Sequence, residues 1–193
     1  MYNVHDVLKE HPVEVLQAIS ARDRLPYAIM LMNFEHDLNI GNCIRSAHLL
    51  GCESVIIFGK NKIDSRSTVG AHNYLNLIKV AVDMESTNSV RDAFIDVMEK
   101  MKLYPLYIDK VKGSADINAP YFENAVSKHH TSNIPCLVFG NEATGIHPET
   151  VLTNSAFFHI KQRGVIRSFN VASAASIVMY RTSQILENKN ARF

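Results

Sequence analysis

Residues 134–145 read IPCLVFGNEATG, and this stretch decides the fold class of the chain. The apolar run from Ile134 to Phe139 has the length of a buried strand, and Gly140 ends it. The run carries no alternation of polar and apolar residues, so both faces of the strand must be covered. Strands of this kind are typical of parallel sheets with helices on both faces.

Similar apolar runs recur along the chain and alternate with helical patterns. Further strands are expected at residues 27–32, 54–59, 103–108 and 156–160, the third of them near an edge or a bend because it contains Pro105. Helices are expected at residues 3–20, 40–50, 87–101 and 169–187, with shorter ones near 121–127 and 147–152. Such alternation predicts an α/β fold with a mainly parallel sheet and helices on both of its faces.

The size and composition are those of one globular domain. The chain has 193 residues, of which 47% are hydrophobic and 20% charged, enough for one substantial core. We expect a short N-terminal helical extension at residues 1–25 and one domain at residues 26–193. The polar stretch 109–133 reads as a long surface excursion. The helix expected at 169–187 is apolar on nearly every side, which favours burial against the sheet and a second subunit.

Charge, cysteine spacing and hydropathy bear on whether the protein binds nucleic acid, holds a metal or spans a membrane. A net charge of +1 neither favours nor excludes a nucleic-acid partner. The three cysteines form no CxxC pair and no cluster has metal-ligand spacing, so we expect buried, reduced thiols and no metal. No signal peptide and no membrane-spanning stretch is visible, which predicts a soluble cytoplasmic protein without a membrane partner.

Common nucleotide-binding motifs do not fit. The dinucleotide motif GxGxxG is absent. Residues 140–145 have the glycine spacing of a phosphate-binding loop, but Ile146 and His147 follow where lysine and serine or threonine are required. A P-loop is therefore excluded.

Three segments nevertheless place polar residues where a plain fold would not need them. They read NIGNCIR at 39–45, FGNEATG at 139–145 and IKQRGVIRSFNV at 160–171. Each follows a predicted strand, and the carboxyl ends of parallel strands meet at one edge of a sheet. Taken singly, each residue has a simpler explanation, such as a helix cap at Asn39 or Ser168 or a solvent-facing Arg45. Taken together, the three segments favour one shared site.

In this order the segments resemble the SpoU-type (TrmH-like) RNA ribose 2′-O-methyltransferases of the SPOUT superfamily. The resemblance covers roughly residues 26–187. It implies a deep trefoil knot in the C-terminal third, S-adenosylmethionine bound in a bent shape, and a homodimer whose sites draw on both subunits. Residues 26–193 would then be the SPOUT methyltransferase domain.

The resemblance also implies roles for individual residues. It assigns catalysis to five polar residues: Asn39, Arg45, Glu142, Ser168 and Asn170. It assigns the cofactor to six others: Leu137, Gly140, Asn141, Gly145, Ile160 and Phe169. Some family members are described as using the arginine as a general base. Because a guanidinium almost never gives up its proton, gripping the adjacent phosphate is the alternative role.

The third segment departs from the family pattern in two places. Lys161 stands where the family usually has proline, and Phe169 stands where it usually has leucine. Basic residues nearby, together with those after the second strand, form either a phosphate-binding patch or a solvated rim. The RNA-binding candidates are Arg45, Lys60, Arg66, Arg163 and Arg167, with Lys62 and Lys161 beside them. We expect RNA as the partner, with tRNA favoured over rRNA.

Two other functions fit parts of the sequence. A non-catalytic RNA-binding protein would keep the knot, but a decayed member should have lost at least one of Arg45, Glu142, Ser168 and Asn170. A nucleotide enzyme on an ordinary doubly wound sheet would have no knot and no RNA-dependent turnover. The intact polar positions favour the methyltransferase.

Overall fold

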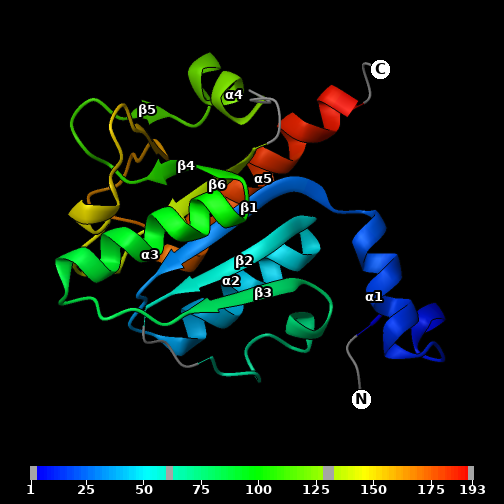
Figure 1. Cartoon of the computed structure of the whole chain (residues 1–193). Helices are drawn as coiled ribbons and strands as arrows, with labels where there is room; N and C mark the ends of the chain where they lie inside the picture. The colour runs from blue at the N-terminus through cyan, green and yellow to red at the C-terminus, as the bar shows by residue number, and fades with distance from the viewer. Residues whose placement is uncertain (1–3, 60–62, 128–132, 191–193) are drawn as a thin grey trace.

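The computed structural model of the chain describes residues 4–59, 63–127 and 133–190, and a single parallel sheet organises them (Figure 1). Its seven strands lie in the order β3-β2-β1-β6-β4-β7-β5, and every paired neighbour is parallel. The strands are β1 (Leu25–Met32), β2 (Cys52–Phe58), β3 (Asn76–Val80), β4 (Leu103–Ile108), β5 (Ala115–Asp116), β6 (Ile134–Phe139) and β7 (Ala156–His159). The predicted α/β fold with a parallel sheet is confirmed.

Helices cover both faces of this sheet. The α-helices are α1 (Val13–Arg22), α2 (Asp37–Leu49), α3 (Thr87–Lys100), α4 (Pro120–Ser127) and α5 (Val171–Asn190). Single turns of 3-10 helix are η1 (Asp6–Leu8), η2 (Ala71–Asn73) and η3 (Pro148–Thr150). Helices α2, α4 and α5 share one apolar core with the sheet, and α3 contributes to a second core on the opposite face (Figure 1).

The burial of strand β1 on both faces explains why every residue from Tyr27 to Met32 is apolar. Tyr27, Ile29 and Leu31 face the core shared with α2 and α5, whereas Ala28 and Met30 face the core shared with α3. All five are fully buried. Since successive side chains of a strand point to opposite faces, a strand covered on both sides needs an apolar residue at every position.

Three strands differ from the expectation: β3 and the two-residue β5 were not predicted, and β4 has another place in the sheet. β3 was not predicted because its residues are mostly half-buried or exposed, as suits a strand at the edge of the sheet. β4 was expected near an edge or a bend, but it lies between β6 and β7 inside the sheet. Pro105 is tolerated there because β4 pairs with β7 only from Leu106 onward, so Pro105 pairs with β6 alone.

The last helix begins two residues later than predicted and packs on the sheet with one face. It begins at Val171 rather than residue 169. One face is buried against the sheet, as Val178 and Met179 show, but Ile177 and Tyr180 remain 38% and 55% exposed. The chain alone therefore covers only one side of this apolar helix.

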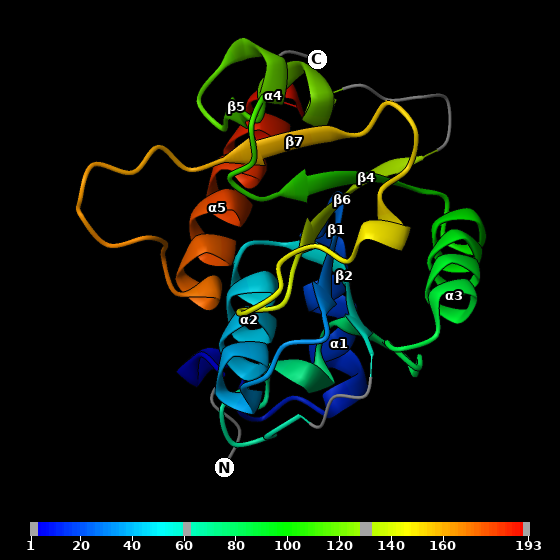
Figure 2. The ribbon, with the colours of Figure 1, turned by 90° about the vertical axis from the view of Figure 1, so that its left-hand side faces the viewer.

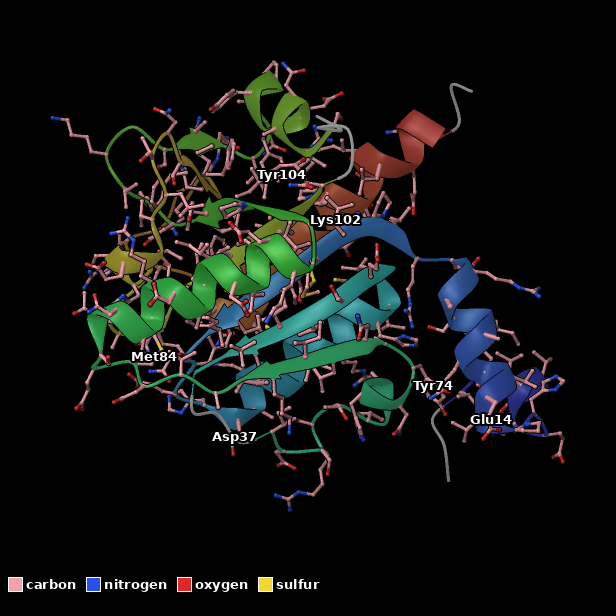
Figure 3. The ribbon with its side chains drawn as sticks, viewed as in Figure 1. Glu14, Asp37, Tyr74, Met84, Lys102 and Tyr104 are labelled. Carbon is pink, nitrogen blue, oxygen red and sulfur yellow. The ribbon has the colours of Figure 1, made fainter. Side chains whose placement is uncertain are left out.

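The N-terminal segment packs beside the start of β2 rather than on the sheet. Its helix begins at Val13, later than predicted, after Pro12. The Ser20 hydroxyl and the Arg24 guanidinium both donate to the backbone oxygen of Tyr74, which lies beside α1 in Figure 3. The excursion 109–133 contains β5 and α4, and residues 128–132 lie outside the described part.

The three cysteines, Cys43, Cys52 and Cys136, are free and buried, as the sequence predicts. Burial raises the pKa of each thiol, that of Cys52 to about 12. Among residues 4–59, 63–127 and 133–190, none of the helices combines the length and apolar character needed to span a bilayer.

Candidate active site

The three polar segments meet in a chain of hydrogen bonds. The Asn39 Nδ2 donates to Glu142 Oε1 at 2.8 Å, and the Asn39 Oδ1 accepts from Asn170 Nδ2 at 3.1 Å. The second carboxylate oxygen of Glu142 accepts from the backbone N–H of Glu35 at 2.8 Å. We call Asn39, Glu142 and Asn170 the polar cluster. Figure 2 shows the start of α2, the turn after β6 and the start of α5 side by side, as the sequence predicted.

The carboxylate fixes the orientation of the cluster. An ionised carboxylate can only accept hydrogen bonds, so Asn39 must turn its NH₂ group toward Glu142 and its oxygen toward Asn170. Partial removal from water acts to raise the pKa of Glu142, but the hydrogen bonds from Asn39 and from the Glu35 N–H outweigh it. The pKa of Glu142 is therefore held below its usual value.

Helix geometry places two members of the cluster. Asn39 was a candidate cap of α2, but the helix begins at Asp37, which puts Asn39 in the first turn, where it is buried. Ser168 was a candidate cap of α5, but Asn170 takes that position. Its Oδ1 accepts from the N–H groups of Ala172 and Ser173 at 2.9 and 3.2 Å.

The turn after β6 is closed on itself. Asn141 and Gly145 exchange two backbone hydrogen bonds of 2.9 Å, and the Asn141 side chain donates to the backbone oxygen of Asn33 at 2.6 Å. A Cβ atom on Gly140 would lie 2.2 Å from the carbonyl carbon of Gly145. Only glycine at position 140 allows the backbone to fold back this closely.

A cavity of about 950 Å³ opens beside the polar cluster at the carboxyl ends of the strands. Its walls come from the end of β4, the turn 140–145, the end of β7 and the segment 160–170, which swings out from β7 before α5 (Figure 2). Predicted site residues that line it are Asn39, Gly140, Asn141, Glu142, Gly145, Ile160, Arg167, Ser168, Phe169 and Asn170. The expected convergence therefore holds for most of the site.

The chain matches one family of known proteins over most of its length. The model of the SpoU rRNA Methylase family matches residues 26–180. The chain belongs to this family. No curated protein sequence matches it significantly.

Solved structures of SpoU proteins share this fold. The TrmH/SpoU tRNA modifying enzyme from A. aeolicus is 19% identical with a TM-score of 0.70, and the match covers 92% of this chain and 84% of that one. An AdoMet-bound rRNA methyltransferase from Sinorhizobium meliloti is 21% identical with a TM-score of 0.64, covering 86% of this chain and 60% of its own. The AdoMet complex of AviRb from Streptomyces viridochromogenes is 22% identical with a TM-score of 0.60, covering 83% and 58%. This SpoU chain thus spans less than two thirds of the last two.

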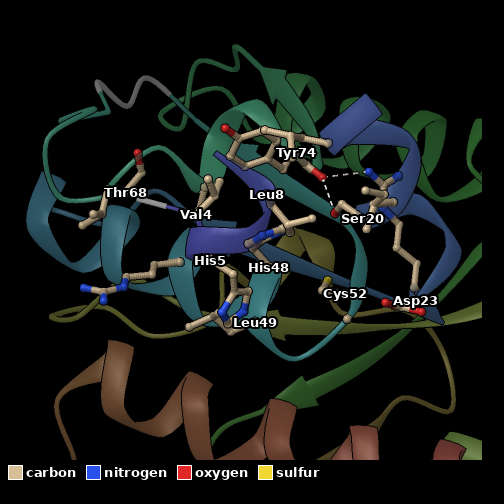
Figure 4. A pocket seen from close by; sticks show the side chains of 17 residues that line it. Val4, His5, Leu8, Ser20, Asp23, His48, Leu49, Cys52, Thr68 and Tyr74 are labelled. Atoms are coloured by element: carbon tan, nitrogen blue, oxygen red, sulfur yellow. Dashed lines mark hydrogen bonds between the residues drawn. The ribbon is translucent and has the colours of Figure 1, made fainter. Parts of the chain in front are cut away.

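Two of the residues predicted for catalysis or cofactor binding lie away from this cavity. Leu137, expected at the cofactor, is fully buried in the core instead, because its side chain points to the α2 and α5 face of β6. Arg45 is exposed on α2 and lines a second cavity, of about 500 Å³, between α2 and the N-terminal segment. The residues that line this cavity include His5 and Leu8 of the N-terminal segment, His48 of α2 and Tyr74 (Figure 4).

The candidate RNA-binding residues do not gather at one place. Arg167 lines the large cavity, and Arg163 is exposed on the same segment. Arg66 is paired with Asp64 at 3.0 Å in the loop before η2. Lys60 and Lys62 lie outside the described residues. The basic side chains that the structure describes therefore lie on more than one surface of the protein.

Residues to which the sequence analysis gave no role also shape the site. Gly41, inside the first SpoU motif, packs so closely on the loop before η2 that a Cβ would lie 1.6 Å from Ser67 Oγ. Asp109 and His159 line the large cavity directly after β4 and at the end of β7. Their position at the carboxyl end of a strand was the available signal. Within the described residues, histidine, cysteine and carboxylate side chains form no group of three that could hold a metal.

Proposed function

We propose that this chain transfers a methyl group from S-adenosylmethionine to a ribose 2′-hydroxyl of RNA and acts as a homodimer. One observation carries the proposal: the polar residues of three separate SpoU motifs form one hydrogen-bonded cluster beside a large cavity. Membership of the SpoU rRNA Methylase family and the AdoMet complexes of structural relatives support the same activity.

The cavity fits a nucleoside cofactor. Its volume of about 950 Å³ lies within the range of cofactor sites. Ile160 and Phe169 offer apolar surface for an adenine ring, and the loops around them offer backbone N–H and C=O groups. The cofactor, when bound, supplies a methyl group on a positively charged sulfur.

The polar cluster acts by positioning. Both oxygens of Glu142 already accept hydrogen bonds, and its lowered pKa keeps it ionised at neutral pH. It therefore anchors Asn39, which in turn holds Asn170 at the start of α5. Methyl transfer requires the acceptor oxygen in line with the methyl group, so a fixed pair of amides beside the cavity contributes directly to the rate.

Arg45 supplies positive charge to the RNA. A ribose hydroxyl is a very weak acid, and negative charge grows on its oxygen as the methyl group transfers. A guanidinium can hold the adjacent phosphate with two hydrogen bonds and stabilise that charge. We therefore assign to Arg45 the phosphate-binding role rather than the role of a base.

A homodimer explains why Arg45 lines a different cavity from the polar cluster. We propose that the partner subunit brings its own arginine to the cavity of this one. The exposed side of α5 supports this arrangement, because Ile177 and Tyr180 lie three residues apart and form an uncovered apolar stripe. We propose this stripe as part of the interface.

The C-terminal trefoil knot belongs to the same proposal. Helix α5 packs against α2 and α4 and also contacts β1 and β6. The two segments that would form the knot, 140–145 and 160–170, both border the large cavity next to the start of α5. A knot would hold both segments in place around the cofactor.

The substrate and compartment complete the proposal. We favour tRNA over rRNA, in line with the TrmH/SpoU tRNA modifying enzyme that covers most of this chain. Three buried free thiols suit a reducing compartment, which supports a cytoplasmic enzyme.

Incubation of the purified chain with methyl-labelled S-adenosylmethionine tests the activity. Fractionated tRNA and rRNA serve as acceptors, and the products are digested to nucleosides. We expect label in a 2′-O-methylnucleoside from tRNA. Label in a base contradicts the assigned acceptor, and RNA binding without transfer supports the non-catalytic alternative.

A further inference from the structure

Asp109 is a carboxylate of the large cavity that no SpoU motif contains. It follows β4 directly, is half-buried and lines the cavity. Its Oδ2 lies 3.1 Å from where a Cβ on Gly145 would be, so the carboxylate rests against the backbone of the turn 140–145. Within the described residues this side chain has no hydrogen-bond or ion-pair partner, which leaves both oxygens free to accept from a ligand.

The strand order places Asp109 along the cavity. The sheet runs β1-β6-β4-β7 at this edge. The polar cluster lies at the β1 and β6 end, Asp109 follows β4, and Ile160 follows β7. Neighbouring strands are roughly 4.8 Å apart, so Asp109 lies about one strand spacing beyond the turn that carries Glu142 and one before Ile160.

The cofactor has its own order of groups. The reactive methyl group belongs beside the polar cluster, the adenine belongs beside the apolar Ile160, and the ribose joins the two. A carboxylate between the two ends therefore faces the ribose. Two vicinal hydroxyl groups are the natural donors to one carboxylate, as in dinucleotide sites where an acidic residue binds the ribose.

We propose that Asp109 binds the cofactor ribose, its carboxylate accepting hydrogen bonds from the 2′- and 3′-hydroxyl groups. This inference rests on the cofactor part of the proposed function and is independent of which RNA is methylated. It gives the cavity a polar middle between an apolar adenine end and a hydrogen-bonded reactive end.

Calorimetric titration with S-adenosylhomocysteine, without RNA, measures how replacing Asp109 changes cofactor binding alone. Asp109→Ala should raise the Kd roughly ten- to hundred-fold, the range for hydrogen bonds to a charged group. Asp109→Asn keeps the shape, so a loss there cannot come from a failed fold. Asp92→Ala removes the same charge from the exposed surface of α3 and should leave the Kd unchanged.

The 2′-deoxy and 3′-deoxy analogues of S-adenosylhomocysteine identify the group that Asp109 touches. The wild-type protein should lose affinity for each analogue, and Asp109→Ala should bind the analogues and the parent compound about equally. The same loss in both proteins would overturn the ribose contact and point to the charged methionine end. Unchanged parent affinity in both Asp109 variants would overturn the inference alone, whereas no binding by the wild-type protein would overturn the cofactor proposal with it.

Discussion

Asn39 and Glu142 are joined by a hydrogen bond of 2.8 Å although they are 103 positions apart in the chain. One lies in the first turn of α2 and the other in the turn that closes after β6. Because β1 and β6 are parallel neighbours, the segments that follow them leave the sheet at the same edge. The hydrogen bond is thus a direct consequence of the strand order.

The pKa of Glu142 predicts a pH dependence of stability. A carboxyl group whose folded pKa is lowered contributes stability above its unfolded pKa, near 4.3, and loses it as the pH falls through the folded pKa. At pH 6 to 8 the free energy of unfolding of the wild type should exceed that of Glu142→Gln by about 1 kcal/mol. The value is modest because the side chain is exposed. The difference should shrink below about pH 4.

Urea unfolding at each pH measures this difference. Glu99→Gln, an exposed position on α3, controls for the loss of one negative charge. A stability difference that stays constant down to pH 3 would show that Glu142 is not held in its ionised form by the cluster.

Gly140 predicts a steric effect on the turn. An added Cβ would meet backbone atoms of Gly145 and Ile146 at 2.2 and 2.4 Å, so Gly140→Ala should destabilise the fold by about 2 kcal/mol. Gly164→Ala is the matched control, since nothing lies within 4 Å of its added Cβ. Thermal unfolding of both variants gives the comparison. Equal melting temperatures would contradict the tight closure of the turn.

Replacing Arg45 should reduce methyl transfer without reducing the affinity for the cofactor. Arg45→Ala should lower methyl transfer at least about a hundredfold, the scale for removing one group that stabilises developing charge. Affinity for S-adenosylhomocysteine should stay within about twofold, because the proposal assigns Arg45 to the RNA phosphate and not to the cofactor. Arg91→Ala on the exposed surface of α3 is the control. Full turnover in the Arg45 variant refutes the assignment.

Mixed dimers test whether Arg45 serves the partner's site. Neither Arg45→Ala nor Asn170→Ala alone should be active. In a mixed dimer, one site receives an intact arginine from one subunit and an intact cluster from the other, so activity should reappear. Absence of any recovery, with mixing verified by mass, would place Arg45 and the cluster in the same subunit's site.

The uncovered side of α5 predicts the dimer interface. Ile177→Glu should convert the protein to a monomer, measured by light scattering after size exclusion, because it places a charge in an apolar contact. Val15→Glu on α1 starts from nearly the same exposure, 40% against 38%, and should leave the dimer intact. Dimers in both variants would place the interface elsewhere.

The buried strands were readable from the sequence because burial on both faces requires unbroken apolar runs, as in β1 and β6. β3 has one sheet neighbour and exposed side chains, so its sequence carried a weak signal. Pro105 was misleading because its effect depends on where the pairing with β7 starts, which is a property of the register.

The polar cluster was readable for a related reason. Asn39, Glu142 and Asn170 each follow a strand, and parallel strands deliver such residues to one edge. Arg45 lies six positions after Asn39, which is about 240° of rotation at 3.6 residues per turn. The two side chains therefore leave α2 in different directions, and spacing in a motif does not reveal that they line different cavities. Leu137 was expected at the cofactor but lies in the core. The face of the sheet to which its side chain points depends on the register of β6, which the sequence does not show.

A crystal structure with S-adenosylhomocysteine tests the central claim most directly. The ligand should lie in the large cavity, between the turn 140–145 and the segment 160–170, with its sulfur beside the polar cluster and its adenine near Ile160. A ligand bound on another face, or a cavity that stays empty at saturating concentration, would contradict a shared site built from the three segments.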